Sequence, residues 1–186
     1  LSSHKFGGPI GVSGLIVKNK IKFRNFLAGG EQEYSIRSGS SNFLLIPAFA
    51  KALEFTKSEK YKNKMKLVLS WQEWFENKLR EVAPNILIFG EKASRLTNVT
   101  HFCIPAIQSE NIIFSMDIDN IIISSGSSCS SKVKKESYVV KSMKYSKKIA
   151  TNSVRVSWGW KSKKDELSIF IEKLKCITES YNIKAA

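Results

Sequence analysis

The sequence predicts an α/β fold, in which helices pack on a sheet of short strands. After Pro84, short apolar runs separated by turns alternate with helical segments, which is typical of α/β layers rather than of an all-β barrel. The 186 residues are 42% hydrophobic and 25% charged, a composition typical of one or two small globular domains. No apolar run reaches the roughly 18 residues that a membrane span requires, so we expect no membrane partner.

The first part of the chain contains one expected strand, one loop and one helix. Residues 14–17 (Gly-Leu-Ile-Val) follow a Gly/Pro-rich turn and are predicted to form a short buried strand. Residues 29–42 are mostly Gly, Ser and other polar side chains, which indicates a loop. Residues 43–56 are predicted to form a helix with an apolar stripe of Leu45, Phe49 and Leu53.

Residues 58–82 are predicted to form a single second helix that ends just before Pro84. Beyond it, the apolar runs predict four strands, at 86–89, 99–104, 121–123 and 154–158. Further helices are expected at 109–117 with Ser109 as its cap, at 136–143, and at 163–179 with Ser162 as its cap and Asp165 three residues on. The apolar face of the last helix is Leu167, Phe170, Ile171, Leu174 and Ile177.

The three cysteines are an odd number with no CxxC pair. A disulfide framework and a structural zinc site are therefore disfavoured, no metal site is predicted, and a reducing compartment such as the cytoplasm fits best. Cys103 in an apolar strand and Cys176 on the last helix are expected to be buried structural residues. Cys129 differs, because it lies in a Ser/Gly-rich loop where a thiol is expected to be exposed and reactive.

The net charge is +14, from 30 basic and 16 acidic side chains. A basic chain can bind nucleic acid by neutralising phosphates, but 25 of the cations are Lys and only 5 are Arg. Arg is favoured for base and phosphate recognition because its fork donates two hydrogen bonds. We therefore expect no nucleic-acid partner.

Three further stretches carry groups suited to chemistry. Lys5 lies beside an imidazole and before a Gly-rich turn, which suits a Schiff-base lysine. Ser3 and His4 can donate hydrogen bonds to a phosphate. The alternative is that Lys5 is a surface lysine in a turn. The Arg-Ser-Gly-Ser run ending at Ser40 offers the donors of an anion site. Arg155 lies in an apolar strand, where it either pairs with a structural carboxylate or binds a substrate carboxylate.

Together these motifs resemble the cysteine desulfurases of the NifS/IscS-like group, in the class-V aminotransferase family of fold-type-I pyridoxal-phosphate enzymes. Four motifs of that family occur in its order along nearly the whole chain. They are S-x-H-K-x-x-G-P-x-G at Ser2–Gly11, GGGQE…RSGT at Gly29–Ser40, SSGSAC at Ser124–Cys129, and S-x-R-x-S-x-G at Ser153–Gly159.

The resemblance implies a pyridoxal-phosphate site and a role for each candidate residue. Lys5 matches the lysine that binds the cofactor and moves protons, while Ser3 and His4 match ligands of its phosphate. Ser40 matches a threonine that reaches the phosphate of the neighbouring subunit's cofactor, so a homodimer is implied. In place of the family's residues, Glu31 replaces a third Gly and Ser40 replaces Thr.

Two further residues receive roles from the resemblance. Arg155 matches the clamp on the carboxylate of L-cysteine, and Cys129 matches the nucleophile that keeps the sulfur as a persulfide. The persulfide would pass to an iron–sulfur scaffold or another sulfur-acceptor protein. The implied function is a cysteine desulfurase that yields L-alanine.

The resemblance also predicts the domain organisation. Residues 1–61 correspond to the end of the large cofactor-binding domain, and residues 62–186 to the small C-terminal α/β domain with the cysteine loop. The family's groups that contact the cofactor ring lie in an N-terminal half upstream of the lysine motif. We therefore expect this polypeptide to be a fragment that is not a competent desulfurase alone; the alternative is a non-catalytic remnant or interaction module that docks to sulfur-transfer partners.

Overall fold

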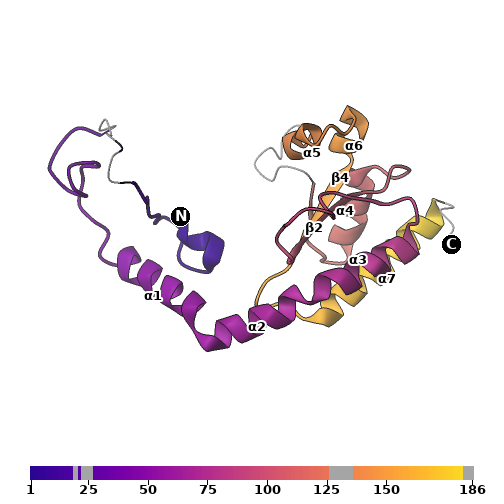
Figure 1. Ribbon diagram of the computed structural model, residues 1–186, viewed down its shortest axis with the longest axis horizontal. Helices are drawn as coiled ribbons and strands as arrows, with labels where there is room; N and C mark the ends of the chain where they lie inside the picture. The colour runs from indigo at the N-terminus through magenta and orange to yellow at the C-terminus, as the bar shows by residue number, and fades with distance from the viewer. Residues whose placement is uncertain (19–20, 22–26, 126–135, 182–186) are drawn as a thin grey trace. The chain divides into compact units, whose positions relative to one another are not determined.

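The computed structural model describes residues 1–18, 21, 27–125 and 136–181. The chain divides into two compact units, Leu1–Asn63 (unit 1) and Lys64–Ala186 (unit 2), and each is described by itself (Figure 1). Among the described residues, none of the helices combines the length and hydropathy needed to cross a lipid bilayer.

Unit 1 contains a short 3-10 helix η1 (Ser3–Phe6), helix α1 (Leu45–Lys57) and the first part of α2 (Glu59–Leu69). The rings of Phe6 and Phe49 meet edge to face with centroids 5.3 Å apart, which packs η1 on α1. None of the residues of α1 is buried. Within the described part of unit 1, Ser3 is the single buried residue, so the unit has no apolar core there.

The buried strand predicted at residues 14–17 is wrong. This segment is irregular, and Leu15 and Ile16 are 71% and 83% exposed. Gly14 exchanges backbone hydrogen bonds with Leu1, beside one isolated antiparallel bridge, but the pairing stops there. A strand needs a neighbouring backbone to bond with, and the described part of unit 1 offers none beyond Gly14. The loop predicted at 29–42 is confirmed as irregular structure.

The single helix predicted at 58–82 is interrupted at Ser70, so α2 ends at Leu69 and α3 (Trp71–Val82) begins after it. The hydroxyl of Ser70 donates to the carbonyl oxygen of Leu67 at 2.7 Å. A serine side chain that bonds to the preceding turn competes with the regular backbone ladder. The apolar periodicity continues across the break, which explains why the pattern predicts one helix.

Unit 2 is built on a four-stranded antiparallel sheet in the order β1-β2-β4-β3. The strand predicted at 121–123 is wrong, because those residues are irregular and the chain joins the sheet only at β3. The other three strands lie within a residue or two of their predicted bounds. The four strands are β1 (Leu87–Ile88), β2 (Val99–Cys103), β3 (Ser124–Ser125) and β4 (Ser153–Ser157).

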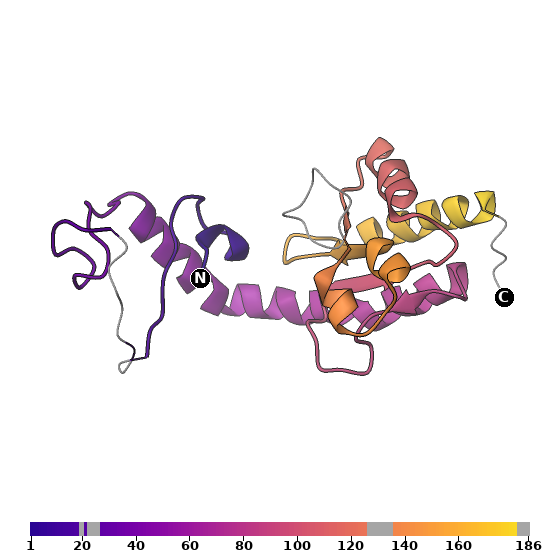
Figure 2. The ribbon, with the colours of Figure 1, turned by 90° about the horizontal axis from the view of Figure 1, so that it is seen from above.

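Helices cover both faces of this sheet, which confirms the predicted α/β layers (Figures 1 and 2). On one face α3, α4 (Ser109–Ile118) and α7 (Lys164–Ser180) bury the main core against β2 and β4. All five apolar residues predicted for the last helix are buried there. On the other face α5 (Tyr138–Ser142) and α6 (Lys147–Thr151) cover a smaller cluster of Phe89, Cys103, Val140 and Ala150.

Several local predictions need correction. Neither predicted cap holds: Ser109 lies inside α4, and α7 is capped by Lys163, whose backbone N–H donates to the Glu166 carboxylate at 3.1 Å. The helix predicted at 136–143 is shorter and is followed by the second helix α6. Cys176 is exposed rather than buried, because it lies on the outer face of α7.

Candidate functional site

The lysine motif forms a tight turn at the start of unit 1. Gly7 ends η1 with φ +91°, a left-handed conformation that glycine adopts without strain, and the Gly8 N–H donates to the Ser3 carbonyl at 3.0 Å. A Cβ on Gly8 would lie 2.0 Å from Ser3 Oγ and 3.1 Å from the Ala52 side chain. The motif's second glycine is therefore required by the close approach of Ser3.

Ser3 and Lys5 differ in exposure although they share one turn of helix. The Ser3 hydroxyl is buried and has no hydrogen-bond partner among the described residues. A buried polar group without a partner is costly unless a ligand satisfies it. His4 and Lys5, in contrast, are exposed. A hydroxyl, an imidazole and a primary amine in one turn suit a ligand with a phosphate and an aldehyde, so the residues present fit pyridoxal phosphate.

The loop that contains Ser40 is held together by hydrogen bonds to and from nearby side chains. Ser38 Oγ donates to the Leu27 carbonyl at 2.9 Å, and the Gly39 N–H donates to the side-chain oxygen of Gln32 at 3.2 Å. Ser40 itself is exposed. Its hydroxyl is thus available on the surface of unit 1, as a role toward a second subunit would require.

In unit 2 the predicted Arg155 lies on one face of the sheet between two polar neighbours. In the antiparallel register Arg155 stands directly opposite His101 on β2 and Ser124 on β3, and directly opposite residues project to the same face. Arg155 is half-buried, and its Nη2 donates to Ser124 Oγ at 3.5 Å. The sheet therefore gathers a guanidinium, an imidazole and a hydroxyl on one face.

His101 is held neutral by its surroundings. Burial first, and the nearby positive charge of Arg155 second, lower the pKa of His101 from 6.5 to about 4. Its ring meets the Phe89 ring edge to face at 5.1 Å, and its buried Nε2 has no hydrogen-bond partner in the part of the chain that the structure describes. A neutral imidazole adds no second positive charge beside the Arg155 guanidinium, and a guanidinium suits binding of a carboxylate.

The predicted nucleophile Cys129 lies outside the described residues, as do its neighbours 126–135. The other two cysteines are free thiols with contrasting surroundings. Burial raises the pKa of Cys103 to about 11, against a smaller opposing effect of the Lys148 charge, so its reactive thiolate is scarce at neutral pH. Cys103 is thus structural, as predicted.

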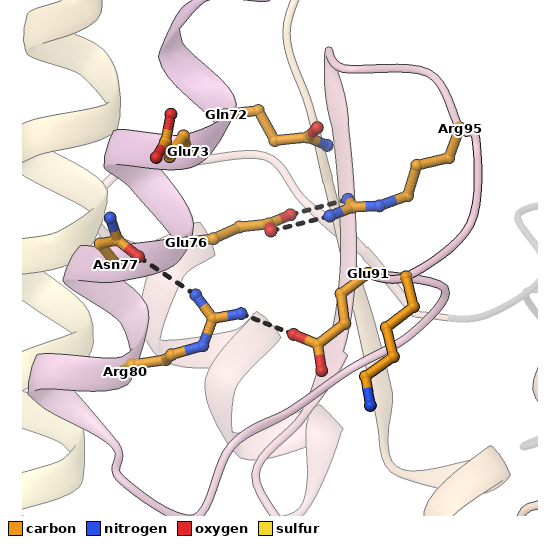
Figure 3. Close-up of a pocket in the computed structure, with 8 residues that line it drawn as sticks. Gln72, Glu73, Glu76, Asn77, Arg80, Glu91 and Arg95 are labelled. Carbon is orange, nitrogen blue, oxygen red and sulfur yellow. Dashed lines mark hydrogen bonds and ion pairs between the residues drawn. The ribbon is translucent and has the colours of Figure 1, made fainter.

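A polar pocket of about 520 Å³ lies elsewhere in unit 2, along α3, and contains none of the predicted site residues (Figure 3). Four of its charged side chains form two ion pairs. Glu76 accepts two hydrogen bonds from Arg95, at 2.7 and 2.8 Å, and Arg80 donates to Glu91 at 2.6 Å. The bond to Glu76 raises the pKa of Arg95. These pairs fix the segment after β1 to α3, so the pocket serves the fold.

Comparison with solved structures defines the class of this chain. A NifS-like protein from Rickettsia africae superposes with a TM-score of 0.80 and 30% identity, over 98% of this chain and 46% of that one. A second NifS-like protein, 22% identical with a TM-score of 0.81, shows the same fold. The fold is that of the NifS-like pyridoxal-phosphate-dependent proteins, as the sequence motifs predict.

The family follows from the sequence. The model of the family described as aminotransferase class-V matches residues 1–170, and this chain belongs to that family. Similar curated proteins include the cysteine desulfurase IscS of Dictyoglomus turgidum, 28% identical over 96% of this chain, and a cysteine desulfurase of Sinorhizobium fredii, 32% identical over 84%. The chain spans 45% and 40% of the length of these two relatives.

His101 was not predicted from the sequence as a member of the site. Its pairing with Arg155 depends on the register between β2 and β4, which are distant in the sequence. The sequence did contain a signal for this pairing, because His101 and Arg155 are each the central polar residue of an apolar strand. Ser3, His4, Lys5 and Ser40 belong to unit 1, whereas Arg155 and Cys129 belong to unit 2.

Proposed function

We propose that this chain carries the C-terminal part of a cysteine desulfurase, which removes sulfur from L-cysteine with pyridoxal phosphate. In this reaction the Cβ–S bond of the substrate breaks, and an S–S bond forms between the substrate sulfur and Cys129 Sγ. The Cβ carbon gains a proton, which gives L-alanine and a Cys129 persulfide. The two sulfur atoms are oxidised and the carbon is reduced, so no outside oxidant is needed.

The observation that carries this proposal is the buried Ser3 hydroxyl beside Lys5, which has no partner among the described residues, in a chain whose relatives are named cysteine desulfurases. Ser3 and His4 would hold the cofactor phosphate, and Lys5 Nζ would bind the aldehyde and then hold and move a proton. When bound, the cofactor supplies an electron sink for bond cleavage at the substrate carbon. We assign residues 1–61 to the end of the cofactor-binding domain.

In the domain that we assign to residues 62–186, Arg155 would bind the substrate carboxylate through its guanidinium. Because His101 is neutral, it adds no second positive charge beside Arg155, and Ser124 supplies a hydroxyl next to the guanidinium. Cys129, four residues after β3 ends, would attack the substrate sulfur as a thiolate. By orienting the substrate carboxylate, Arg155 would present the thiol of L-cysteine to the loop that carries Cys129.

The proposal also covers partners and location. Ser40 would reach the cofactor phosphate of a second subunit, which makes the intact enzyme a homodimer. The persulfide would pass to an iron–sulfur scaffold or another sulfur-acceptor protein. We place the reaction in the cytoplasm, where thiols such as Cys103 and Cys176 stay reduced.

The direct test is titration of the purified chain with pyridoxal phosphate, followed by its visible absorbance. We expect a band that is lost in Lys5→Ala and kept in Lys18→Ala, a matched control because Lys18 is also an exposed lysine of unit 1. Equal bands in both variants would mean labelling of surface amines and would refute the role of Lys5. Desulfurase activity itself is tested by sulfide release from L-cysteine.

One observation favours a second candidate, a non-catalytic module that docks to sulfur-transfer partners. The described part of unit 2 has an apolar core, whereas the described part of unit 1, which carries Lys5, has none. The docking module predicts that partner capture persists in Lys5→Ala and Cys129→Ala, while the desulfurase predicts loss of sulfur transfer in both. The two variants therefore separate the candidates.

A further inference from the structure

In unit 2, lysines lie over tryptophan rings where α2, α3 and the start of α7 meet. Lys64 Nζ on α2 lies 5.5 Å from the centroid of the Trp71 ring, and Lys164 Nζ on α7 lies 4.6 Å from that of Trp74. Each ammonium is attracted by the electrons of its ring, as happens within about 6 Å of a ring centroid. Trp71 and Trp74 are three residues apart on α3, which packs beside α7 (Figure 1), so the two pairs share one face of α3.

A third pair lies in the turn that joins β4 to α7. Lys161 Nζ is 5.4 Å from the centroid of the Trp160 ring. This turn is fixed to α2, because the indole N–H of Trp158 donates to the carbonyl oxygen of Val68 at 3.0 Å. The three pairs therefore belong to one region of unit 2. We call the following residues the tryptophan–lysine surface: Lys64, Trp71, Trp74, Trp160, Lys161 and Lys164.

The lysines of this surface are not neutralised by carboxylates. Neither they nor the adjacent Lys163 form an ion pair within the described residues, although most other parts of the chain pair their lysines locally. Two carboxylates, Asp165 and Glu166, lie in the first turn of α7, where the helix N-terminus attracts them. The Glu166 carboxylate already accepts from the backbone N–H of Lys163. The ammonium groups can therefore bind carboxylates of another molecule.

The geometry favours an acidic polypeptide over a nucleic acid. Proteins that bind single-stranded nucleic acid stack its bases on open aromatic faces. Here each ring has an ammonium over its face, and Trp71 is only 5% exposed, so a base has little ring to stack on. A carboxylate needs only the ammonium group, and a lysine already held on a ring loses less conformational freedom on binding. We propose that the tryptophan–lysine surface binds a polypeptide segment rich in Asp and Glu.

The test titrates the chain with an oligoglutamate peptide at low ionic strength. Binding is followed by calorimetry and by tryptophan fluorescence, because three of the four tryptophans belong to the surface. We expect binding that is weakened about fivefold or more in the double variant Lys161→Gln/Lys164→Gln. Both side chains are exposed, so the change leaves the apolar core of unit 2 intact, and urea unfolding verifies this.

The matched control is Lys144→Gln/Lys147→Gln, which removes the same charge from exposed lysines at α5 and α6, on the other face of the sheet. Peptide binding that is absent, or that both double variants weaken equally, would overturn the proposal. Tighter binding of an oligothymidylate of equal charge, or of phosphatidylserine vesicles, would also overturn it, because a nucleic acid or a lipid would then be the occupant. The inference does not rest on the proposed activity, so Lys5→Ala should bind the peptide like the unchanged chain even if pyridoxal phosphate does not bind.

Discussion

Replacement of His101 by asparagine should remove a specific part of the acid sensitivity of unit 2. The pKa of His101 falls from 6.5 in the unfolded chain to about 4 in the folded protein, because burial and the Arg155 charge disfavour the imidazolium. The free energy of unfolding is therefore highest above pH 6.5, where the ring is neutral in both the folded and the unfolded state. It falls as the pH drops from 6.5 toward 4, because the unfolded state then takes up a proton that the folded state does not. At about 1.4 kcal/mol per pKa unit, the free energy of unfolding decreases by about 3 kcal/mol in all. About 2 kcal/mol of this decrease occurs between pH 7.5 and pH 5.

The assay is urea unfolding at pH 7.5 and pH 5, followed by the fluorescence of the four tryptophans, all of which lie in unit 2. The unchanged chain should lose about 2 kcal/mol more than His101→Asn between these two pH values. His4→Asn is the control, because it removes the only other histidine of the chain and that residue is exposed in unit 1. Equal acid sensitivity of the unchanged chain and His101→Asn would refute the reasoning.

Three other changes test the packing and the site. Glu76→Gln should lower the free energy of unfolding by about 3 kcal/mol, because it leaves the half-buried Arg95 without its carboxylate; urea unfolding measures this, and a loss below about 1 kcal/mol would contradict it. Gly8→Ala should weaken the Lys5-dependent absorbance of bound pyridoxal phosphate, because the new methyl group displaces Ser3; an unchanged titration would refute that role. Cys103 should resist thiol reagents at pH 8 until the chain is unfolded, because burial raises its pKa to about 11. Peptide mapping measures the labelling, and a labelled Cys103 in the folded chain would contradict this prediction.

The sequence predicted best those elements whose pattern is local. The apolar face of α7 repeats at helical spacing and packs on one side only, so its buried residues could be listed from the spacing alone. The interruption at Ser70 could not be foreseen, because a single serine hydroxyl decides it while the periodicity continues. The segment 14–17 was misjudged because strand formation depends on a partner that the local pattern does not contain.

The same distinction applies to the candidate site. The motif around Lys5 is contiguous, so its residues could be chosen before the structure, although the exposure of Lys5 could not. The group around Arg155 is assembled by strand register, and the sequence offered Arg155 without His101. Arg155 Nη2 donates to the Ser124 hydroxyl, and both possibilities stated for its guanidinium, a structural carboxylate or a substrate carboxylate, stay open.

The described part of unit 1 has no apolar core around Ser3 and Lys5, and this has a thermodynamic consequence. With little buried apolar surface, the ordered form of this unit depends on what binds to it. A ligand that binds only the ordered form stabilises that form by RT ln(1 + [L]/Kd). Amide exchange in η1 and α1 should therefore slow as the concentration of pyridoxal phosphate rises, so that the stability of the turn around Ser3 reports how much cofactor is bound.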